Sequence, residues 1–452
     1  MPDNKTNQQD LTRPPSQEIS VLGGHLRPFW RDRTGFLIRN AELGDVSYFE
    51  LGNQPVYFLN HPDHVRDMFV GNAEKFTKGR AFQRAKLFLG NGLLTSEREF
   101  HLRQRRMIQP AFHRERVVEY ARAMVEYGDM MAREWQDGEV RDIDREMMRL
   151  TLQVVGKALF GAEMNDDADE FFEALTTSIG VFNYMQVPFS ELLEDLPGEQ
   201  SSEFTNARDT LDRIVYGIIN ERRRTGEDKG DLLSMLLMAQ DEDDGSVMTD
   251  EQVRDEALTL FLAGHETTAN AMTWMWYMLS LNPEKEAKLH AEVDSVLGDR
   301  LPGMDDFPKL KYTEAVFAES MRLYPPVWSV GRYVVEPHDF GGYTVPVDAI
   351  AMVSQYVMHR DARFWDDPND FVPERWAKVS VKEANQRYIY FPFGSGVRRC
   401  IGESFSWAEG VILIAILARK WKLRLDPDQR IGMDPMITLR PKYGMRMKLL
   451  SR

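Results

Sequence analysis

The chain has 452 residues, of which 43% are hydrophobic and 28% charged, a composition typical of a globular protein with a large core. Its formal net charge of −15 argues against nucleic acid as a partner, because an acidic surface repels a polyanion. A single cysteine excludes disulfide bonds within the chain and fits a reducing, cytoplasmic compartment.

The length alone would suggest two or three domains of roughly 150 residues each. However, no linker rich in Pro, Gly or Ser divides the chain, so we expect one domain over residues 21–452. Residues 1–20 are polar and are expected to form a disordered tail. They contain no apolar run, and we therefore expect neither a secretory signal nor a membrane anchor.

The elements predicted along the chain are mostly helices. Residues 46–51 and 56–59 predict a hairpin, and the glycine-punctuated residues 78–95 predict an irregular loop. Apolar residues spaced three and four apart predict helices over residues 114–135, 142–159, 169–181, 202–224, 231–240 and 312–323. Short strands are predicted over residues 330–335, 344–347, 350–354, 437–439 and 445–449. The fold class is therefore mainly α with a minor β region.

A long helix is predicted over residues 250–281, opened by a capping box of Thr249 with Gln252. It is apolar on nearly every side, so it should be buried. The polar block that begins at Ala263 and Gly264 interrupts this pattern with His265, Glu266 and Thr267. A zinc-protease HExxH motif fails here, because residue 269 is Ala. Alternatively, Thr267 could simply donate a hydrogen bond to the carbonyl of Ala263.

The only cysteine, Cys400, follows a glycine-rich stretch and two arginines, Arg398 and Arg399. A lone cysteine is by default a small buried hydrophobe. The adjacent positive charge, and the start of a predicted helix over residues 402–420, would instead favour a thiolate. One thiolate cannot complete a zinc or iron–sulfur site, whereas a haem needs only one.

The pattern Phe393-x-x-Gly396-x-Arg398-x-Cys400-x-Gly402 resembles the haem-ligand signature of the cytochromes P-450, the haem-thiolate monooxygenases. The resemblance implies the α-rich fold of that family, with haem b between the long helix and the Cys400 loop. The block from Ala263 to Thr268 resembles its distal-helix signature. It implies a loosened helical turn, room for dioxygen at Ala263 and Gly264, and catalytic proton delivery by Thr267 and Glu266.

The same resemblance implies further roles. His101-x-x-x-Arg105 resembles the Trp-x-x-x-Arg element whose arginine pairs with a haem propionate, with His in place of Trp. The residues expected to contact the haem are His101, Arg105, Ala263, Gly264, Arg332, Phe393, Arg398 and Cys400. Glu319 and Arg322 alone would be only a surface pair. Together with Arg375, they resemble the Glu-Arg-Arg network that braces the fold around the haem.

The substrate pocket is expected to be apolar, and its predicted lining residues are Phe82, Phe88, Phe182, Val327, Val330 and Ile437. The aromatic stretch at residues 182–189 could equally pack in the core at a helix end. Resemblance to bacterial members with motifs such as Phe-Pro-Phe-Gly favours a fatty acid or another lipid as substrate. The implied reaction inserts one oxygen atom from dioxygen into a C–H or C=C bond.

Electrons must come from elsewhere, since the chain has no GxGxxG after a strand and no ferredoxin cysteines. We therefore expect a ferredoxin or flavodoxin with its reductase, docking on a basic patch of Arg103, Arg106, Arg398, Arg399, Arg419 and Lys420.

Three alternatives to a monooxygenase stay open. A peroxide-driven peroxygenase would carry an Arg-Pro pair in the distal helix, an isomerase tends to lack the threonine, and a haem sensor would need no proton relay.

Overall fold

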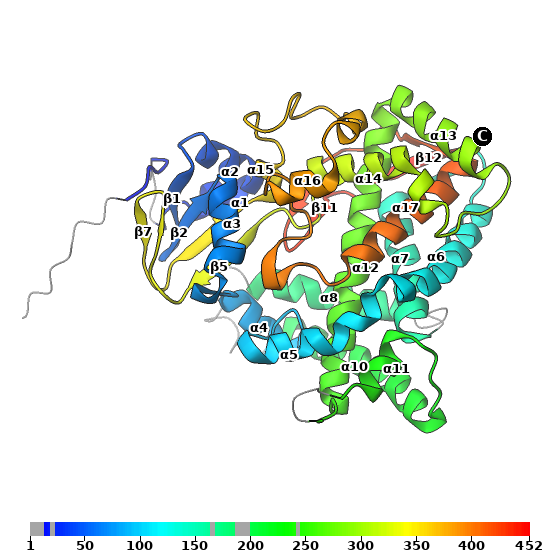
Figure 1. Ribbon diagram of the computed structural model, residues 1–452, viewed down its shortest axis with the longest axis horizontal. Helices are drawn as coiled ribbons and strands as arrows, with labels where there is room; N and C mark the ends of the chain where they lie inside the picture. The colour runs from blue at the N-terminus through cyan, green and yellow to red at the C-terminus, as the bar shows by residue number, and fades with distance from the viewer. Residues whose placement is uncertain (1–12, 19–22, 163–167, 186–198, 241–244) are drawn as a thin grey trace, which may run out of the picture.

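The computed structural model describes residues 13–18, 23–162, 168–185, 199–240 and 245–452. Helices make up most of it, and the strands gather mainly beside the N-terminal helices (Figure 1). The prediction of a mainly α protein with a minor β region is confirmed. Residues 1–12 and 19–20 of the expected tail lie outside the described residues. Within residues 13–18, Pro15 accepts a 2.9 Å hydrogen bond from the backbone N–H of Tyr48.

The α-helices are α1 (Leu26–Arg31), α2 (Arg33–Ala41), α3 (Pro62–Arg66), α4 (Arg80–Leu89), α5 (Arg98–Ile108), α6 (Arg114–Glu134), α7 (Ile143–Phe160), α8 (Ala168–Met185), α10 (Glu199–Thr225), α11 (Leu232–Met238), α12 (Asp250–Leu281), α13 (Pro283–Leu297), α14 (Lys311–Leu323), α15 (Gln355–Met358), α16 (Val381–Gln386) and α17 (Glu403–Lys420). A π-helical turn, η1 (Asp67–Gly71), continues α3, and short 3-10 turns include η3 (Gln109–Phe112), η5 (Pro373–Ala377) and η6 (Gly396–Arg398). The predicted long helix has the bounds of α12, and its capping box is formed as expected.

The largest sheet has five strands in the order β1-β2-β8-β5-β3, where β2 and β8 are parallel and the other neighbours antiparallel. These strands are β1 (Val46–Leu51), β2 (Gln54–Leu59), β3 (Phe76–Thr77), β5 (Val330–Val334) and β8 (Ile350–Val353). Three smaller sheets pair β6 (His338–Phe340) with β7 (Tyr343–Val345), β10 (Met433–Pro435) with β11 (Leu439–Pro441), and β4 (Val140–Asp142) with β12 (Arg446–Ser451) and β9 (Trp421–Leu425).

One element was predicted wrongly: residues 78–95 contain α4 rather than an irregular loop throughout. Gly79 and Gly90 mark the two ends of this helix, so the glycines that suggested a loop are its boundaries. Gly90 has a φ of 65°, a conformation that favours glycine and stops a helix. The error matters because α4 carries two of the predicted substrate residues, Phe82 and Phe88.

Helix α12 is the centre of the main core. It packs against α7, α10, α14 and α17, and both Trp274 and Trp276 on it are fully buried. The ring of Trp274 stacks on Tyr324 at 4.3 Å between centroids, and that of Phe261 stacks on Phe160 at 4.1 Å. Large aromatic side chains bury the most apolar area per residue, so α12 gives the rest of the fold a rigid reference.

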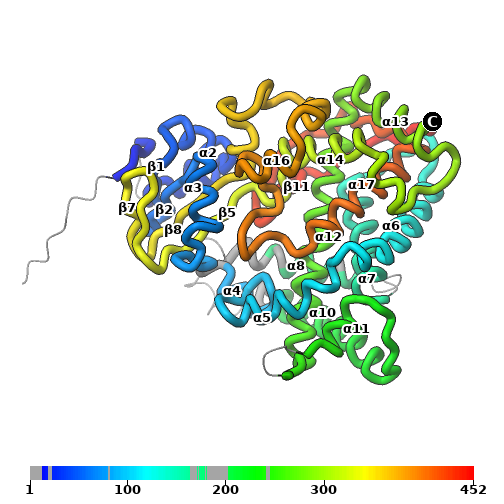
Figure 2. The backbone as a smooth tube through the Cα atoms, viewed as in Figure 1, coloured from blue at the N-terminus to red at the C-terminus, as the bar shows by residue number. Residues whose placement is uncertain are grey.

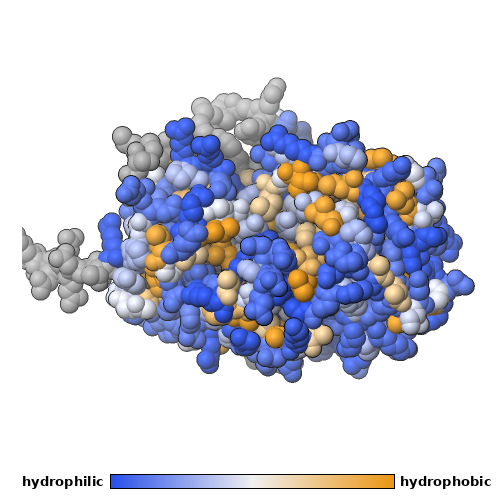
Figure 3. All heavy atoms as spheres, turned by 90° about the horizontal axis from the view of Figure 1, so that it is seen from above, coloured by the Kyte–Doolittle hydropathy of each residue, from blue (hydrophilic) through white to orange (hydrophobic). Residues whose placement is uncertain are grey.

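The loop that precedes α17 passes close to α5 (Figure 2). Arg105 of α5 donates a 2.7 Å hydrogen bond to the carbonyl of Arg399 in this loop, which fixes the two segments together. On the face seen in Figure 3, hydrophilic side chains predominate and hydrophobic ones form separate patches. Among the helices of the described ranges, none combines the length and the apolar character that a bilayer crossing requires.

Candidate active site

The Cys400 loop is shaped by its own backbone hydrogen bonds. The N–H of Cys400 donates to the carbonyl of Phe393 at 2.9 Å, and the N–H of Gly394 donates to Phe391 at 2.9 Å. Gly396 has a φ of 66°, and a Cβ there would lie 2.0 Å from the carbonyl oxygen of Phe69. Only glycine fits this position, because the loop passes directly over the π-helical turn η1.

Glu319, Arg322 and Arg375 meet, as the sequence predicted. The fully buried carboxylate of Glu319 accepts two 2.9 Å bonds from Arg322 and one of 3.0 Å from Arg375. It also accepts a 3.0 Å bond from the indole of Trp376, a partner that sequence reasoning missed. The buried carboxylate is thus paired with two guanidiniums, and further N–H groups of Arg322 donate to the backbone carbonyls of His359, Pro368 and Asp370, so the buried charges are hydrogen-bonded.

His359 connects this group to the cysteine loop and was also missed. Arg322 donates a 2.8 Å bond to the backbone carbonyl of His359, whose Nε2 accepts a 2.9 Å bond from the N–H of Phe391. Burial, followed by the charges of Arg322 and Arg360, holds the pKa of His359 well below its usual value. The ring is therefore neutral at pH 7, as an acceptor nitrogen requires. No local sequence pattern around His359 indicates this contact.

The thiol of Cys400 is exposed, although protein surrounds it closely enough for burial to raise its pKa to about 11. The expectation that Arg398 and Arg399 favour a thiolate is therefore incomplete. Arg398 is paired with Glu97, and Arg399 with Glu403, so their charges are largely compensated. Burial therefore disfavours the thiolate in the protein by itself, whereas a bound metal ion would favour it.

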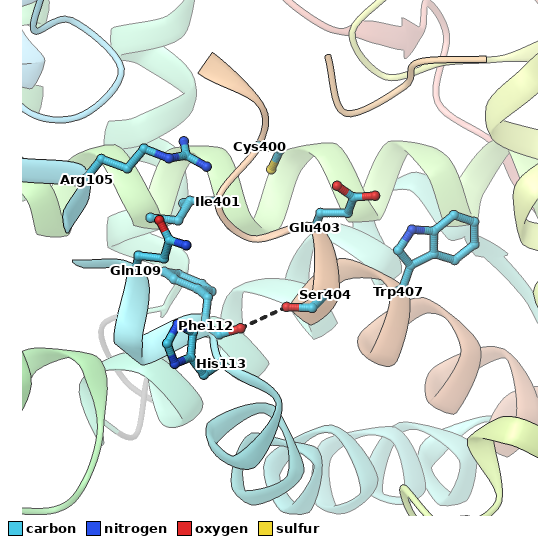
Figure 4. Close-up of a pocket in the computed structure, with 9 residues that line it drawn as sticks. All are labelled: Arg105, Gln109, Phe112, His113, Cys400, Ile401, Glu403, Ser404 and Trp407. Carbon is cyan, nitrogen blue, oxygen red and sulfur yellow. Dashed lines mark hydrogen bonds between the residues drawn. The ribbon is translucent and has the colours of Figure 1, made fainter. Parts of the chain in front are cut away.

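The sulfur borders a cavity of about 400 Å³ (Figure 4). Its lining comes from α5 and η3 on one side and from the start of α17 on the other, and it consists of Arg105, Gln109, Phe112, His113, Cys400, Ile401, Glu403, Ser404 and Trp407. The guanidinium of Arg105 extends toward Cys400 in this view, while Ser404 donates a 3.0 Å bond to the carbonyl of Phe112. The guanidinium of Arg105 on α5 therefore places a positive charge on the side of the cavity that faces the sulfur.

Helix α12 presents a small accessible face at its middle. Between Val253 and Trp276, every residue is buried except Ala263, Gly264 and Thr267. These positions follow each other at i, i+1 and i+4, so they lie on one side of the helix. The polar block thus lies where a ligand can reach an otherwise buried helix. The helix itself continues through the block without the loosened turn that the resemblance implied.

Thr267 donates a 2.8 Å hydrogen bond to the carbonyl of Ala263, which is the alternative that the sequence left open. This bond does not remove the hydroxyl from a functional role. Because its proton is committed, the accessible oxygen can still accept a hydrogen bond from a ligand. His265 is buried and its Nδ1 bonds to the carbonyl of Phe261 at 2.8 Å, so it is a satisfied core histidine. Within the described ranges, no cluster of His, Cys, Asp or Glu could hold a metal ion.

Glu266 is buried and turned toward strand β11. Its Oε1 accepts hydrogen bonds from the hydroxyl of Thr438 and, at 2.7 Å, from Nε of Arg440. The side chain of Arg440 is 25% exposed and thus links the buried carboxylate to the surface. Asp144, at the start of α7, interacts electrostatically with both. Thr438, Arg440 and Asp144 are therefore neighbours of Glu266 that sequence reasoning had not identified, and the link from Glu266 to a solvent relay stays a prediction.

Cationic side chains concentrate beside the cysteine loop. Lys78, Arg105, Arg332 and Arg398 are half-buried there, and burial lowers the pKa of each, that of Arg332 to about 10. Within the described residues, Glu97 is the carboxylate that bonds Arg398, and it also accepts the backbone N–H of Lys78. Burial and the neighbouring Arg398 lower the pKa of His101 to about 3, so this ring is neutral. Such a cluster fits an anionic ligand.

The residues predicted to contact the substrate differ in their burial and do not all lie in one place. The segments that carry Val327 and Ile437 lie side by side, because Leu439 donates a 2.8 Å bond to the carbonyl of Pro326 and Trp328 donates one of 2.8 Å to that of Met436. Phe88 is buried in the core, 6.5 Å from the ring of Phe204 in α10. Phe82 and Val330 are half-buried. The side chain of Phe182 and residues 186–189 lie outside the described part of the chain.

The predicted basic patch is wrong in part. Arg419 and Lys420 lie at the far end of α17, about 24 Å from its start at about 1.5 Å of rise per residue. There, Arg419 donates to the carbonyl of Asp299, and Lys420 faces Asp129. Arg103 contacts Ser246. Arg106 and Arg399 remain on the cysteine side, the first exposed and the second paired with Glu403.

Residues 31–448 match the family described as Cytochrome P450. The chain belongs to the cytochrome P-450 family. It is 37% identical over 441 residues to the cyclooctatin synthase of Streptomyces melanosporofaciens, an alignment that covers 96% of each chain. It is 32% identical over 432 residues to the pentalenene oxygenase of Streptomyces avermitilis, which covers 95% of each. It is 36% identical over 408 residues to the cyclooctat-9-en-7-ol 5-monooxygenase of S. melanosporofaciens, covering 90% of this chain and 88% of the relative.

The chain is therefore a cytochrome P-450 monooxygenase, and its cofactor is haem. The residues present fit that group on three counts: an accessible cysteine thiol, a small accessible face on α12, and a cationic cluster suited to propionates. The assignment of Cys400 as the iron ligand, and of His101, Arg105, Arg332, Arg398 and Phe393 as further contacts, stays a prediction that this arrangement supports. Lys78 belongs to the same cluster and had not been predicted.

Asp144 provides a test of the network around Glu266. Burial, and then the neighbouring Asp142, raise the pKa of Asp144 from 3.8 to about 7 against the opposing charge of Arg440. Between those values the folded protein keeps a proton that the unfolded chain has released. The free energy of unfolding should therefore fall as the pH rises toward 7, and Asp144→Asn should abolish that fall.

We expect Asp144→Asn to gain about 2 kcal/mol relative to the unmodified protein between pH 5.5 and pH 8. The measurement is urea unfolding of the haem-loaded protein at a series of pH values. The control is Glu119→Gln, a substitution of an exposed carboxylate on α6 that should leave the pH dependence unchanged. If the free energy of unfolding of Asp144→Asn and of the unmodified protein changed in parallel with pH, the raised pKa of Asp144 would be contradicted.

Proposed function

We propose that this monooxygenase oxidises a cyclic terpenoid, as a hydrocarbon or as an alcohol derived from one. The observation that supports this most directly is the similarity, over nearly the full length of each chain, to relatives named for cyclooctatin, cyclooctat-9-en-7-ol and pentalenene. None of these names denotes a fatty acid. The lean toward fatty-acid hydroxylation drawn from sequence motifs is therefore replaced by this proposal.

The side chains near the site are consistent with an uncharged, compact substrate. Val327, Val330 and Ile437 are apolar and half-buried, and hydrogen bonds join the segment of Val327 to that of Ile437. A cyclic hydrocarbon would be held by area burial and shape rather than by an ion pair. The orientation of the substrate in the site would then depend on which apolar side chains contact its rings.

The haem, when bound, supplies the activation of dioxygen. In our proposal Cys400 would bind its iron, and the cationic cluster would hold its propionates. Ala263 and Gly264 keep the middle of α12 small, and a Cβ on Gly264 would meet a methyl of Val155 at 3.0 Å. Thr267 offers an acceptor oxygen on the accessible face, and the carboxylate of Glu266, one residue before it, is paired with the partly exposed Arg440.

The three alternatives are less well supported by these residues. A peroxygenase would not need a carboxylate tied to the surface behind the threonine. An isomerase or a haem sensor would not need an accessible hydroxyl on an otherwise buried helix. The combination of Thr267 with Glu266 therefore favours dioxygen as the oxidant.

The proposed substrate class is tested by absorbance titration of the haem-loaded protein. Cyclic terpenes and terpene alcohols should shift the Soret band to shorter wavelength in a saturable way, because an apolar ligand displaces water from the iron. Long-chain fatty acids of similar carbon number serve as the comparison and should bind at least tenfold more weakly. A stronger shift with the fatty acids would refute the terpenoid proposal.

Thr267→Ala tests the proposed catalytic pair. Loss of the hydroxyl should lower the product formed per electron consumed by several-fold and raise hydrogen peroxide in proportion, because proton delivery becomes mispositioned. The matched control is Thr273→Ala: Thr273 makes the same 2.8 Å bond to a carbonyl four residues back, but it lies on a buried part of the same helix. Equal losses in both variants would assign the effect to the helix rather than to the hydroxyl.

We also propose that the electron donor is a separate acidic protein, a ferredoxin or flavodoxin, that docks on the cysteine side near Arg106. Arg106→Glu should slow reduction of the haem by such a donor roughly tenfold at low salt, with a smaller effect at high salt. Stopped-flow reduction measures this rate. Arg419→Glu, at the far end of α17, is the control and should change it little. Equal effects of the two substitutions would contradict docking near Arg106.

A further inference from the structure

One face of helix α12 carries three polar side chains that all bind the same short segment, residues 438–440. Glu266, Asn270 and Trp274 follow each other at intervals of four residues, so they lie on one side of the helix. The carboxylate and the amide bond to the hydroxyl of Thr438, and the indole donates a 2.9 Å bond to the next residue's carbonyl. All three side chains are at most 3% exposed. Buried hydrogen bonds therefore attach this segment to α12 beside Glu266.

The hydroxyl of Thr438 has its proton directed at Glu266. Nδ2 of Asn270 donates a 3.2 Å hydrogen bond to Oγ1 of Thr438. A hydroxyl has one proton to donate, and because an N–H group already reaches its oxygen, that proton goes to Oε1 of Glu266. Thr438 is 6% exposed, so bulk water competes little for this bond. Thr438 is thus a buried donor whose direction is fixed by its neighbours.

The hydrogen bonds that Glu266 accepts fall on the same carboxylate oxygen. Nε of Arg440 donates a 2.7 Å bond to Oε1, the atom that also receives the hydroxyl of Thr438. Within the described residues, Oε2 accepts no hydrogen bond. A carboxyl group places its proton on an oxygen that is not already engaged as an acceptor. Oε2 is therefore the atom of Glu266 that is able to take up and release a proton.

Thr438 and Arg440 hold Glu266 in different ways. Arg440 supplies the opposite charge, but its side chain is long and 25% exposed. Thr438 has a short, β-branched side chain with few rotamers. Its backbone is fixed by the residue that follows, because the N–H of Leu439 donates a 2.8 Å bond to the carbonyl of Pro326. The orientation of the carboxylate therefore depends more on Thr438, whereas Arg440 compensates its charge.

We propose that Thr438 is a positioning residue for proton delivery, because it holds Oε1 of Glu266 and leaves Oε2 to exchange the proton. Oε2 takes up a proton from solvent and releases one toward the site, so the carboxylate is restored after each turnover. The inference rests on the proposed role of Glu266 with Thr267, but it does not depend on which substrate is oxidised. The competing explanation is pocket shape, since Thr438 follows the predicted substrate contact Ile437.

The first experiment measures hydrogen peroxide formed per electron consumed, with the compound that gives the largest Soret shift as substrate. Thr438→Val keeps the shape of threonine without the hydroxyl, and it should raise peroxide roughly threefold while the dissociation constant of the substrate stays within about twofold. Thr438→Ser keeps the hydroxyl and should return peroxide close to the value of the unmodified protein. A role in packing alone would not be rescued by serine. Thr438→Ala replaces Thr438→Val if that variant does not bind haem.

The matched control is Thr313→Val on helix α14. Thr313 is fully buried and its hydroxyl donates a 2.8 Å bond to Oε2 of Glu292, so this substitution removes the same kind of bond elsewhere in the core. It should leave the peroxide yield unchanged. Glu266→Gln is measured in parallel, and it shows whether Glu266 delivers protons at all.

The second experiment measures the bond itself, by urea unfolding of the haem-loaded protein without substrate. Thr438→Val should lower the urea midpoint of the unmodified protein. The same substitution should lower it by less than half as much in Glu266→Ala, because the acceptor of the hydroxyl is already absent. An equal loss in both backgrounds would show that the hydroxyl does not act on Glu266, and would overturn the proposal.

Each outcome of the peroxide measurement decides the proposal. A rise in Thr438→Val that Thr438→Ser reverses, and that Thr313→Val does not show, supports it. No rise in Thr438→Val beside a rise in Glu266→Gln overturns it and leaves the role of Glu266 intact, whereas no rise in either variant overturns both. Weaker substrate binding without extra peroxide overturns it in favour of pocket shape. Equal rises in Thr438→Val and Thr438→Ser assign the effect to packing and overturn it as well.

Discussion

The buried carboxylate of Glu319 is the contact on which the cysteine loop depends. It accepts hydrogen bonds from Arg322, Arg375 and Trp376, and Arg322 in turn holds the backbone of His359, which receives the N–H of Phe391. A fully desolvated ion pair contributes little to stability by itself, but removing one partner leaves an uncompensated charge. The hydrogen bonds of Glu319 are therefore expected to form together or not at all, and together they fix the position of the cysteine loop relative to α12.

Around Cys400, in contrast, positive charges outnumber the negative charges that could pair with them. Burial raises the pKa of the thiol, and the cations Lys78, Arg332 and Arg398 outnumber the carboxylate of Glu97 that faces them. Such features are unfavourable in the protein alone and become favourable with a metal-bound, anionic cofactor. The hydrogen-bonded group around Glu319 thus positions the cysteine loop. The uncompensated cations near Cys400 favour the binding of an anionic ligand beside that loop.

Helix α12 joins the two sides of the site. Its buried aromatic residues fix it in the core, while Ala263, Gly264 and Thr267 stay accessible at its middle. Glu266, one residue away, points in another direction and meets Thr438 and Arg440 of the C-terminal hairpin. Consecutive residues of a helix project about 100° apart, so the accessible hydroxyl of Thr267 and the carboxylate of Glu266 face different sides of α12.

The sequence by itself predicted the bounds of α12 with its capping box, because local periodicity and spacing encode a helix and its start. The family was indicated by the resemblance of the cysteine loop and of the block from Ala263 to Thr268 to known motifs. The same resemblance also identified Glu319, Arg322 and Arg375 as one group. Only the tertiary structure decided which distant segments supply partners: Lys78, His359 and Arg440 became visible through contacts across long stretches of chain. It also showed that α4 replaces the expected loop and that α17 carries Arg419 and Lys420 away from Cys400. Hydrogen bonds and charge balance between remote residues depend on packing in three dimensions, which no local pattern records.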